Sequence, residues 1–206
     1  MAPTSGAPVW MHLESPMEVV DALLGWLARK GADSYDEWVT QTEHALQTAQ
    51  LARHGEADAP AIAAALLHDV GHLLMNEPRP GEPDRRHEEV GARFLANWFG
   101  PEVTTPVRLH VPAKRYLCAV EPTYEGGLSD ASAESLRVQG GAMSPEEVEA
   151  FRATPHYESG VALRRWDDAA KVVDADAGTL DDHRELLIGL VESVPLTLSN
   201  RAGTAG

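Results

Sequence analysis

The most apolar stretch of the chain ends in side chains that a hydrophobic core does not readily accommodate. Residues 62–67 read IAAALL and are followed at once by His68 and Asp69, and His72 comes one helical turn later. Burying a polar group without a partner costs about 1–3 kcal/mol. The sequence therefore predicts that these side chains are satisfied by one another, by a metal ion or by a ligand.

The composition restricts the class of protein and its partners. The chain has 206 residues, of which 43% are apolar, and this suits one domain with a packed core. Its net charge of −15 with histidine neutral argues against a nucleic-acid partner, because such a partner requires Lys and Arg opposite its phosphates. The oligomeric state is left open.

Cysteine content and hydropathy indicate the compartment. Cys118 is the only cysteine, which excludes an intrachain disulfide and fits a reducing environment. No apolar run approaches the roughly 18 residues of a membrane helix, and the N-terminus lacks a basic region followed by an apolar core. We therefore expect a cytoplasmic protein with no membrane partner.

The spacing of apolar residues is helical along most of the chain. It predicts helices over 17–30, 42–53, 59–74, 86–99, 102–117, 144–152, 160–170 and 181–191. Breaks are expected near Pro106 and Pro112, because proline removes a helix hydrogen bond. Since no segment alternates as a strand does, we expect an all-α domain of about eight helices over 16–195. A loose N-terminal leader at 1–15 and a C-terminal tail at 196–206 flank it.

Histidine and aspartate residues on these helices form a pattern that suits metal binding. The candidate ligands are His44, His68, Asp69, His87, His110 and Asp167. Imidazole and carboxylate suit divalent iron, manganese or zinc, and two ions about 3.5–4 Å apart can share a carboxylate. Asp69 is the natural bridge, because it lies beside a histidine in an apolar segment. Four other histidines are expected at the surface or in the leader: His12, His54, His156 and His183.

The order of these residues, H…HD…H…H…D, is that of the HD superfamily, with the extra histidines of its two-metal branch. A narrower resemblance rests on the segments QTEHALQ, ALLHDVGH, HEEVGARFL, HVPAKRYL, LSDASAESLRVQGGAM and RRWDDAAK. Together they resemble the HD-domain mixed-valent diiron oxygenases that cleave the carbon–phosphorus bond of organophosphonates, the PhnZ-like and TmpB-like proteins. The likeness runs from about residue 31 to residue 171 and implies an HD-domain helical bundle. HVPAKRYL and LSDAS…QGG are its specific part, since generic HD hydrolases lack them.

The resemblance implies a cofactor and a set of ligands. The cofactor would be two iron ions in a mixed-valent Fe(II)/Fe(III) state. One iron would be held by His44, His68 and Asp167, the second by His87 and His110, and both by Asp69. Positions that match the family's substrate contacts are His72, Lys114, Ser132 and Arg164, and His72 and Lys114 are also expected to act in catalysis.

The substrate contacts implied by the resemblance make physical sense. Lys114 lies four residues after His110 and would share its helix face, if Pro112 leaves that turn helical. Arg164 likewise lies three residues before Asp167. Two cations, a hydroxyl and an imidazole together suit a phosphonate dianion.

The matching reaction uses O2 to oxidise a 1-hydroxyphosphonate and splits it into a carboxylate and phosphate. The loop GADSYDEW would meet the far end of the substrate, and Glu37 matches the family's acid that faces an ammonium group. Ser34 stands where relatives that cleave aminophosphonates place a gating tyrosine, and Tyr35 follows it. An aromatic and acidic loop suits a quaternary ammonium, through cation–π contacts worth about 0.5–2 kcal/mol.

These features favour 1-hydroxy-2-(trimethylammonio)ethylphosphonate as substrate, with glycine betaine and phosphate as products. The alternative is 2-amino-1-hydroxyethylphosphonate, which gives glycine and phosphate. Two other classes stay open. One is a metal-dependent HD phosphohydrolase, which would work without O2. The other is an inactive HD domain that binds a ligand as a sensor, without turnover.

Overall fold

The computed structural model describes residues 13, 15–32, 39–75 and 86–193. In this part of the chain the regular elements are helices, joined by turns and loops, with no β-strand, which confirms the all-α class. The α-helices are α1 (Pro16–Lys30), α2 (Gln41–His54), α3 (Ala59–Leu67), α4 (Val70–Leu74), α5 (His87–Leu95), α6 (Pro101–Val120), α7 (Asp130–Val138), α8 (Pro145–Arg152), α9 (Tyr157–Ala169) and α10 (Arg184–Glu192), and the short 3-10 helices are η2 (Glu125–Gly127) and η3 (Leu180–His183). None of the described helices combines the length and hydropathy needed to cross a bilayer.

The described chain thus has ten α-helices instead of about eight. The additional helices come from a break inside 59–74 and from α7, a segment for which the sequence predicted no helix. The predicted leader and tail lie almost wholly outside the described residues. The domain limits of 16 and 195 therefore remain predictions.

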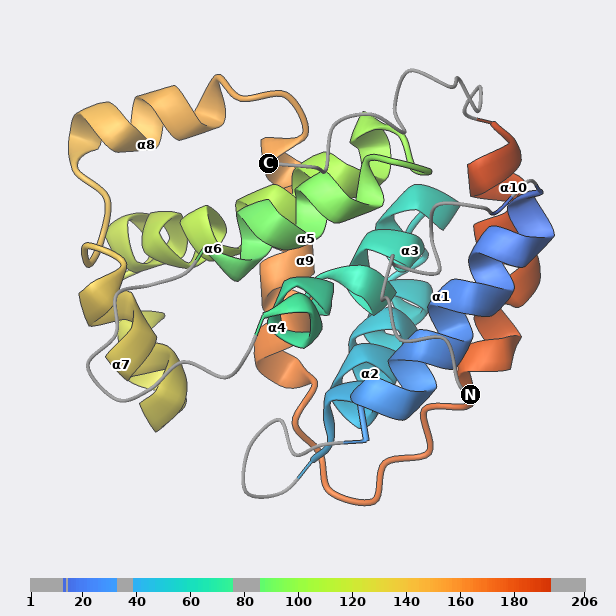
Figure 1. Cartoon of the computed structure of the whole chain (residues 1–206). Coiled ribbons are helices and arrows are strands. Elements are labelled where there is room, and N and C mark those ends of the chain that lie inside the picture. The colour runs from blue at the N-terminus through green and yellow to red at the C-terminus, as the bar shows by residue number, and fades with distance from the viewer. Residues whose placement is uncertain (1–12, 14, 33–38, 76–85, 194–206) are drawn as a thin grey trace.

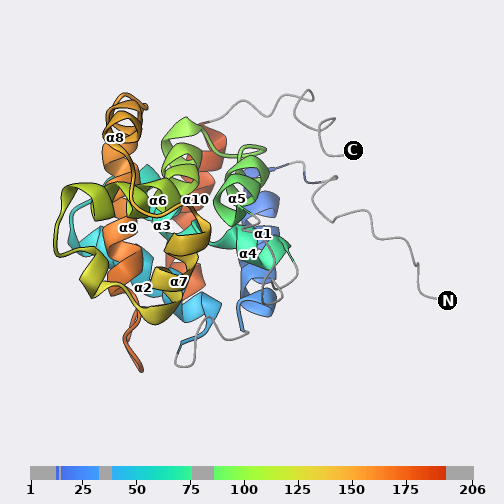
Figure 2. The ribbon, with the colours of Figure 1, turned by 90° about the vertical axis from the view of Figure 1, so that its left-hand side faces the viewer.

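Two hydrophobic cores hold the bundle together, and α6 belongs to both. Helices α6 and α9 cross and pack against each other, and α1 and α10 pack against each other on one flank (Figure 1). The larger core includes Val103 and Val107 of α6. The smaller core includes Ala113 and Leu117 of α6 together with Phe151 of α8. The turned view shows α8 above α9 on one side of the bundle and α1 on the opposite side (Figure 2).

Local signals in the sequence set the start of α2. The Thr40 hydroxyl accepts a hydrogen bond from the Glu43 backbone N–H at 3.1 Å, and the Glu43 carboxylate accepts one from the Thr40 N–H at 2.7 Å. Such a reciprocal capping box stabilises a helix by roughly 1 kcal/mol. It fixes the first turn of the helix that carries His44.

The dipeptide His68–Asp69 separates α3 from α4, so the single helix predicted over 59–74 is wrong. Asp69 has φ −98° and ψ 10°, outside the helical region, and α4 begins at the next residue. Successive side chains of a straight helix point about 100° apart, so an unbroken helix would not direct both to one place. The interruption lets His68 and Asp69 face the same site.

Helix α6 runs without a break through Pro106 and Pro112, so the breaks predicted at these prolines are wrong as well. Its buried positions include 103, 107, 110, 114 and 117, which share one face on both sides of each proline. That face packs against α3, α5 and α9, which compensates for the hydrogen bonds that the prolines remove. Lys114 therefore does lie one turn beyond His110 on the same face.

His183 is buried and not at the surface as its polar neighbours suggested. It is 3% exposed, and its Nδ1 lies 3.4 Å from Nη2 of Arg53 on α2. Here η3 turns the side chain inward just before α10 begins. A short 3-10 turn has no periodicity long enough to be recognised in the sequence, which is why the prediction failed.

Candidate metal centre

The six candidate ligands come together in the interior from helices that are distant in sequence. His44 lies on α2, His68 and Asp69 at the junction of α3 and α4, His87 at the start of α5, His110 on α6 and Asp167 on α9. None of these side chains is more than 11% exposed. Their ligand atoms form two groups of three, and the atoms of each group lie within 4.8 Å of one another.

The first group contains His44, His68 and Asp167. The Nε2 atoms of the two histidines are 3.2 Å apart. Oδ1 of Asp167 lies 3.3 Å from Nε2 of His44 and 4.0 Å from Nε2 of His68. Three ligand atoms thus surround one point, as a metal ion requires.

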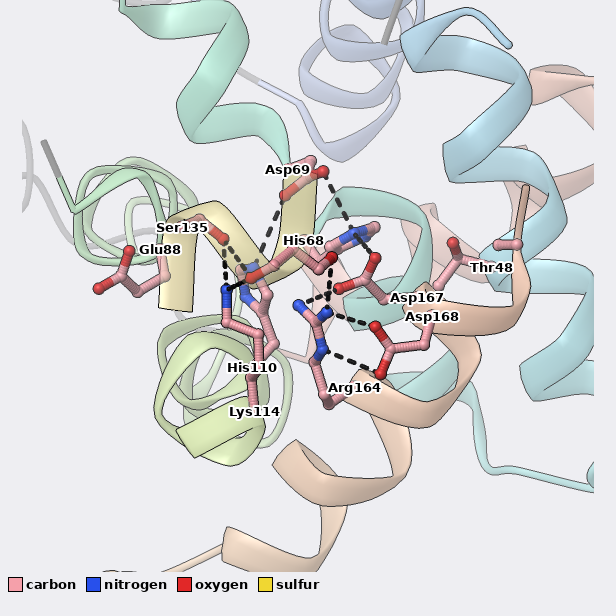
Figure 3. Close-up of polar contacts among 12 residues, drawn as sticks. Thr48, His68, Asp69, Glu88, His110, Lys114, Ser135, Arg164, Asp167 and Asp168 are labelled. Atoms are coloured by element: carbon pink, nitrogen blue, oxygen red, sulfur yellow. Dashed lines mark hydrogen bonds and ion pairs between the residues drawn. The ribbon is translucent and has the colours of Figure 1, made fainter. Parts of the chain in front are cut away.

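The second group contains His87, His110 and Asp69. The two Nε2 atoms are 3.0 Å apart, and Oδ1 of Asp69 lies 3.4 Å from that of His87 and 3.6 Å from that of His110. The other oxygen of Asp69, Oδ2, lies 3.4 Å from Nε2 of His68 in the first group. Figure 3 shows the two oxygens turned toward different rings. Asp69 therefore has the position of a carboxylate that bridges two metal ions.

Hydrogen bonds on the outer side of the rings prepare them to bind a cation. Three rings meet a backbone carbonyl through Nδ1: His44 that of Ala170 at 2.8 Å, His68 that of Ala65 at 2.9 Å and His110 that of Val107 at 2.6 Å. A neutral imidazole carries one proton, so these bonds hold it on Nδ1 and leave a lone pair on Nε2. The lone pairs of His44 and His68 then face each other, and a metal ion between them relieves the repulsion.

The buried carboxylates of Asp69 and Asp167 carry negative charge that a metal cation would balance. Oδ1 of Asp167 is buried and has no hydrogen-bond partner among the residues that the structure describes. Burial by itself raises the pKa of Asp69 and Asp167, but His68 and Arg164 respectively outweigh it and hold both values well below the usual range. Burial lowers the pKa of His68, yet Asp69 and Asp167 raise it to about 9. A metal ion would replace the proton that these charges attract, so the residues fit a dinuclear metal site.

Two buried cations lie on one side of this site. Lys114 on α6 is 2% exposed, and its ammonium donates to Oγ of Ser135 at 2.5 Å and to the carbonyl of Ser132 at 3.4 Å. Burial, together with the nearby Arg164, lowers the pKa of Lys114 to about 8. Arg164 on α9 donates from Nη1 to Asp167 at 2.8 Å and from Nη2 to the hydroxyl of Ser132 at 3.3 Å. The structure thus brings Lys114, Ser132 and Arg164 together beside the candidate ligands.

His72 lies at the edge of the second group. Its ring stacks on that of His87 with 3.8 Å between centroids, and its Nε2 is 4.0 Å from Oδ1 of Asp69. Burial and the neighbouring His87 lower its pKa to about 4, which leaves the ring neutral at pH 7. Its side chain is 35% exposed, so it can reach a bound molecule. Tyr35 and Glu37 lie outside the described residues.

Three residues that contact the site were not predicted from the sequence. Ser135 holds the Lys114 ammonium, and Asp168 and Tyr124 hold the guanidinium of Arg164. The position of Asp168, four residues after Arg164 on one helix, could have indicated that pair. Ser135 and Tyr124 had no comparable signal, since only the fold brings them there.

The fold and the site define a helical enzyme of the HD type, and comparison with known proteins agrees. The HD domain family matches residues 42–140. The chain is 49% identical over 163 residues to a hydroxymethylphosphonate dioxygenase of Gimesia maris, which spans 77% of this chain and 81% of that protein. It is 41% identical over 162 residues to the glycine-betaine-forming [1-hydroxy-2-(trimethylamino)ethyl]phosphonate dioxygenase of Leisingera caerulea, over 77% and 83% of the two chains.

A third relative is an uncharacterized protein, L432, of Acanthamoeba polyphaga mimivirus, 34% identical over 86% of this chain and 84% of that protein. The matches to the two dioxygenases extend well beyond the HD domain itself. The chain therefore belongs to the HD-domain phosphonate dioxygenases, oxygenases that act on carbon–phosphorus bonds.

Proposed function

We propose that this protein uses two iron ions and O2 to cleave the carbon–phosphorus bond of a small 1-hydroxyphosphonate. The observation that carries the proposal is a carboxylate, Asp69, shared between two ligand groups, with Lys114 and Arg164 buried beside them. A phosphohydrolase needs metal ions and an attacking water, but it has no requirement for O2. Membership of the dioxygenase family favours the oxygenase.

The residues that would hold the irons are those of the two groups, with His44, His68 and Asp167 at one ion and His87 and His110 at the other. Asp69 would contact both. When bound, a mixed-valent iron pair would supply the redox chemistry with O2 that amino-acid side chains lack. The protein orients the substrate and keeps water away from it.

The phosphonate dianion would bind beside the metal ions. Lys114 offers a buried ammonium, whose charge is stronger there than in water because the interior has a low dielectric constant. The Ser132 hydroxyl accepts a hydrogen bond from Arg164, and its own proton is then free to be donated to a phosphonate oxygen. His72 is neutral and can exchange a hydrogen bond with the phosphonate or the 1-hydroxyl.

The reaction is balanced by one O2 per substrate. R–CH(OH)–PO3 as a dianion and O2 give R–COO⁻, hydrogen phosphate and one proton. The bond between C1 and phosphorus breaks, a new bond from phosphorus to oxygen forms, and C1 is oxidised to the carboxylate. No other reductant or oxidant is needed.

Two kinds of substrate fit this scheme, and each has an observation in its favour. Tyr35 and Glu37 in the loop GADSYDEW favour 1-hydroxy-2-(trimethylammonio)ethylphosphonate, which gives glycine betaine, or its unmethylated 2-amino analogue, which gives glycine. The 49% identity to a hydroxymethylphosphonate dioxygenase favours hydroxymethylphosphonate, which would give formate.

A panel of phosphonates tests the proposal. Iron-loaded protein is incubated in air with the three 1-hydroxyphosphonates and with methylphosphonate as a control, and phosphate release and O2 consumption are measured. We expect equal amounts of phosphate formed and O2 consumed for at least one hydroxyphosphonate, and none for methylphosphonate. Phosphate release from a phosphomonoester under anaerobic conditions would establish a hydrolase instead, and binding without any release would establish a sensor.

The variant Glu37→Gln separates the two kinds of substrate. An acid that faces a quaternary ammonium attracts it by its charge and matters only for a cationic substrate, so its loss should raise KM for the trimethylammonio compound about tenfold. KM for hydroxymethylphosphonate should stay unchanged. Equal effects on both would contradict the role of Glu37 at the cationic end.

A further inference from the structure

The guanidinium of Arg164 lies between a candidate metal ligand and a candidate substrate contact. It is 5% exposed and donates from Nη1 to Oδ2 of Asp167 at 2.8 Å. From Nη2 it donates to the hydroxyl of Ser132 at 3.3 Å. Its orientation therefore affects both the carboxylate of α9 and the hydroxyl of α7.

The opposite edge of the guanidinium is held by two side chains to which the sequence and the family comparison give no role. Asp168 accepts from Nη2 through Oδ1 and from Nε through Oδ2, the latter at 3.2 Å. The Tyr124 hydroxyl lies 3.3 Å from Nε and donates to Oδ2 of Asp168. Figure 3 shows the guanidinium enclosed between Asp167 and Asp168.

We call this arrangement the clamp: Asp168 holds the guanidinium of Arg164, and Tyr124 holds both Asp168 and the guanidinium. A paired guanidinium–carboxylate contact fixes the plane of the guanidinium, because its N–H groups form a rigid fork. The tyrosine then fixes the carboxylate from outside the pair. Burial raises the pKa of Tyr124, so its hydroxyl keeps its proton and remains the donor to Asp168.

We propose that Asp168 and Tyr124 are positioning residues that set the orientation of Arg164 and so align Ser132 for the phosphonate. The proposal rests on the proposed function, in which Ser132 and Arg164 face the phosphonate. With Nε and Nη2 directed to Asp168 and Ser132, Nη1 is the end of the guanidinium turned to Asp167 and the metal site. The phosphonate would meet an Arg164 whose plane is already fixed, which reduces the ordering cost of binding.

The role predicts weaker binding without loss of metal. We expect Asp168→Asn to raise the dissociation constant for a phosphonate-like anion about tenfold, because the amide holds only one edge of the fork. Tyr124→Phe should raise it about threefold, since it removes the Tyr124 hydroxyl alone. The iron content of both variants should equal that of the unmodified protein, because all six candidate ligands remain.

The experiment measures binding of inorganic phosphate to iron-loaded protein by calorimetry under anaerobic conditions, so that no turnover is required. The matched control is Glu121→Gln, which makes the same chemical change at an exposed partner of Arg165, the residue next to Arg164. It should leave phosphate binding unchanged. An unchanged or smaller dissociation constant in Asp168→Asn would overturn the proposal.

A double-mutant cycle distinguishes positioning from a general structural effect. If Asp168 acts through Arg164, Asp168→Asn should change the dissociation constant less than twofold in an Arg164→Gln background. A full tenfold effect there would overturn the proposal. If Arg164→Gln does not fold, the decision falls to Tyr124→Phe, for which unchanged phosphate binding overturns it.

Failure of the proposed function would look different from failure of this inference. Protein that binds phosphate through the clamp but releases none from any hydroxyphosphonate would leave the positioning role intact and remove the oxygenase assignment. If the protein is active but its phosphate affinity is unchanged in the Asp168 and Tyr124 variants, the oxygenase assignment stands and the positioning role is removed.

Discussion

Asp69 and Asp167 lie close together in the candidate site but have different partners. The two oxygens of Asp69 contact different histidine groups, while Arg164 holds the carboxylate of Asp167. A carboxylate that bridges has to keep both oxygens free of other partners, and Asp167 is steadied by its guanidinium instead. Asp69 and Asp167 are therefore the same residue type in two distinct positions, and the proposed chemistry needs both.

The lowered pKa of Lys114 predicts a pH dependence of substrate binding. Its pKa is lowered to about 8, first by burial and then by Arg164, so the cationic form is lost as pH rises through that value. We expect KM for a 1-hydroxyphosphonate to rise about fivefold between pH 8 and pH 9, as the charged fraction falls. Steady-state kinetics over pH 6.5–9.5 provide the measurement.

The variant Lys114→Gln supplies the comparison for that profile. Its KM should be higher at pH 7 and should not change around pH 8. A wild-type KM that is flat across this range would remove Lys114 from the phosphonate site. The same burial disfavours the folded state below pH 8, because the unfolded lysine titrates at 10.5; that penalty is relieved as pH rises from about 8 to 10.5.

His110 tests the second ligand group. His110→Ala removes one of the two imidazoles there, so we expect the purified protein to retain one iron per chain in place of two and to release no phosphate. Metal analysis and the phosphate assay measure these outcomes. His54→Ala, at an exposed position, should keep both irons and full activity. Two irons per chain in His110→Ala would contradict the assignment.

At the scale of elements, the contact between α4 and α5 sets the second ligand group. A Cβ atom on Gly71 of α4 would lie 1.9 Å from the carbonyl oxygen of His87, which is backbone and has little freedom to move. The start of α5 therefore packs directly on α4 at the point where His87 enters the site. Only glycine permits this approach.

The variant Gly71→Ala should push α5 away and displace His87. We expect a loss of about 2–3 kcal/mol in the free energy of unfolding, as is usual for an overpacked contact, together with loss of one iron. Denaturant unfolding and metal analysis measure the two effects. Gly189→Ala is the matched control, because a Cβ there meets nothing within 4 Å; it should be neutral or stabilise by about 0.5–1 kcal/mol. A Gly71→Ala protein with normal iron content would show that α4 does not position His87.

The helices also show which structural features can be predicted from the sequence and which cannot. Helix positions follow from the spacing of apolar residues and from caps such as Thr40, both of which are local. The interruption at His68–Asp69 was missed because the apolar spacing continues up to it without change. The continuity of α6 through Pro106 and Pro112 was missed because packing of a shared face, which is tertiary, outweighs the local effect of proline.

The same distinction holds for the site. The six candidate ligands were found because histidine and aspartate in apolar segments are unusual and occur in a fixed order. Ser135 and Tyr124 were missed, since single polar residues in ordinary surroundings carry no pattern. Their contacts depend on α7 and the segment after α6 folding over the site.

At the scale of the whole molecule, the candidate metal site joins helices α2, α3, α5, α6 and α9. Metal bound only by the folded chain stabilises it by mass action, by about 4 kcal/mol when the free ion is at a thousand times its Kd. For a chain of this length that corresponds to a decrease in Tm on metal removal of about 10 °C. Calorimetry before and after chelation measures the decrease.

Restoring the metal provides the control for that measurement. Addition of Fe(II) under anaerobic conditions should recover the original Tm, whereas Mg²⁺, which prefers oxygen ligands, should not. In His110→Ala the decrease on chelation should be smaller. A Tm that does not respond to chelation would mean that the ligands hold their places without metal.

The uninterrupted course of α6 also fixes a length. His110 and Lys114 are separated along its axis by four residues, which is about 6 Å at the usual rise per residue. In the proposed function His110 holds an iron ion and Lys114 binds the phosphonate, so the substrate would have to span this interval. A 1-hydroxyphosphonate has a single carbon between its alcohol and its phosphonate. Hydroxyphosphonates whose alcohol lies one carbon farther from phosphorus would not match this spacing. The rise of α6 between the two residues would then contribute to the choice of substrate.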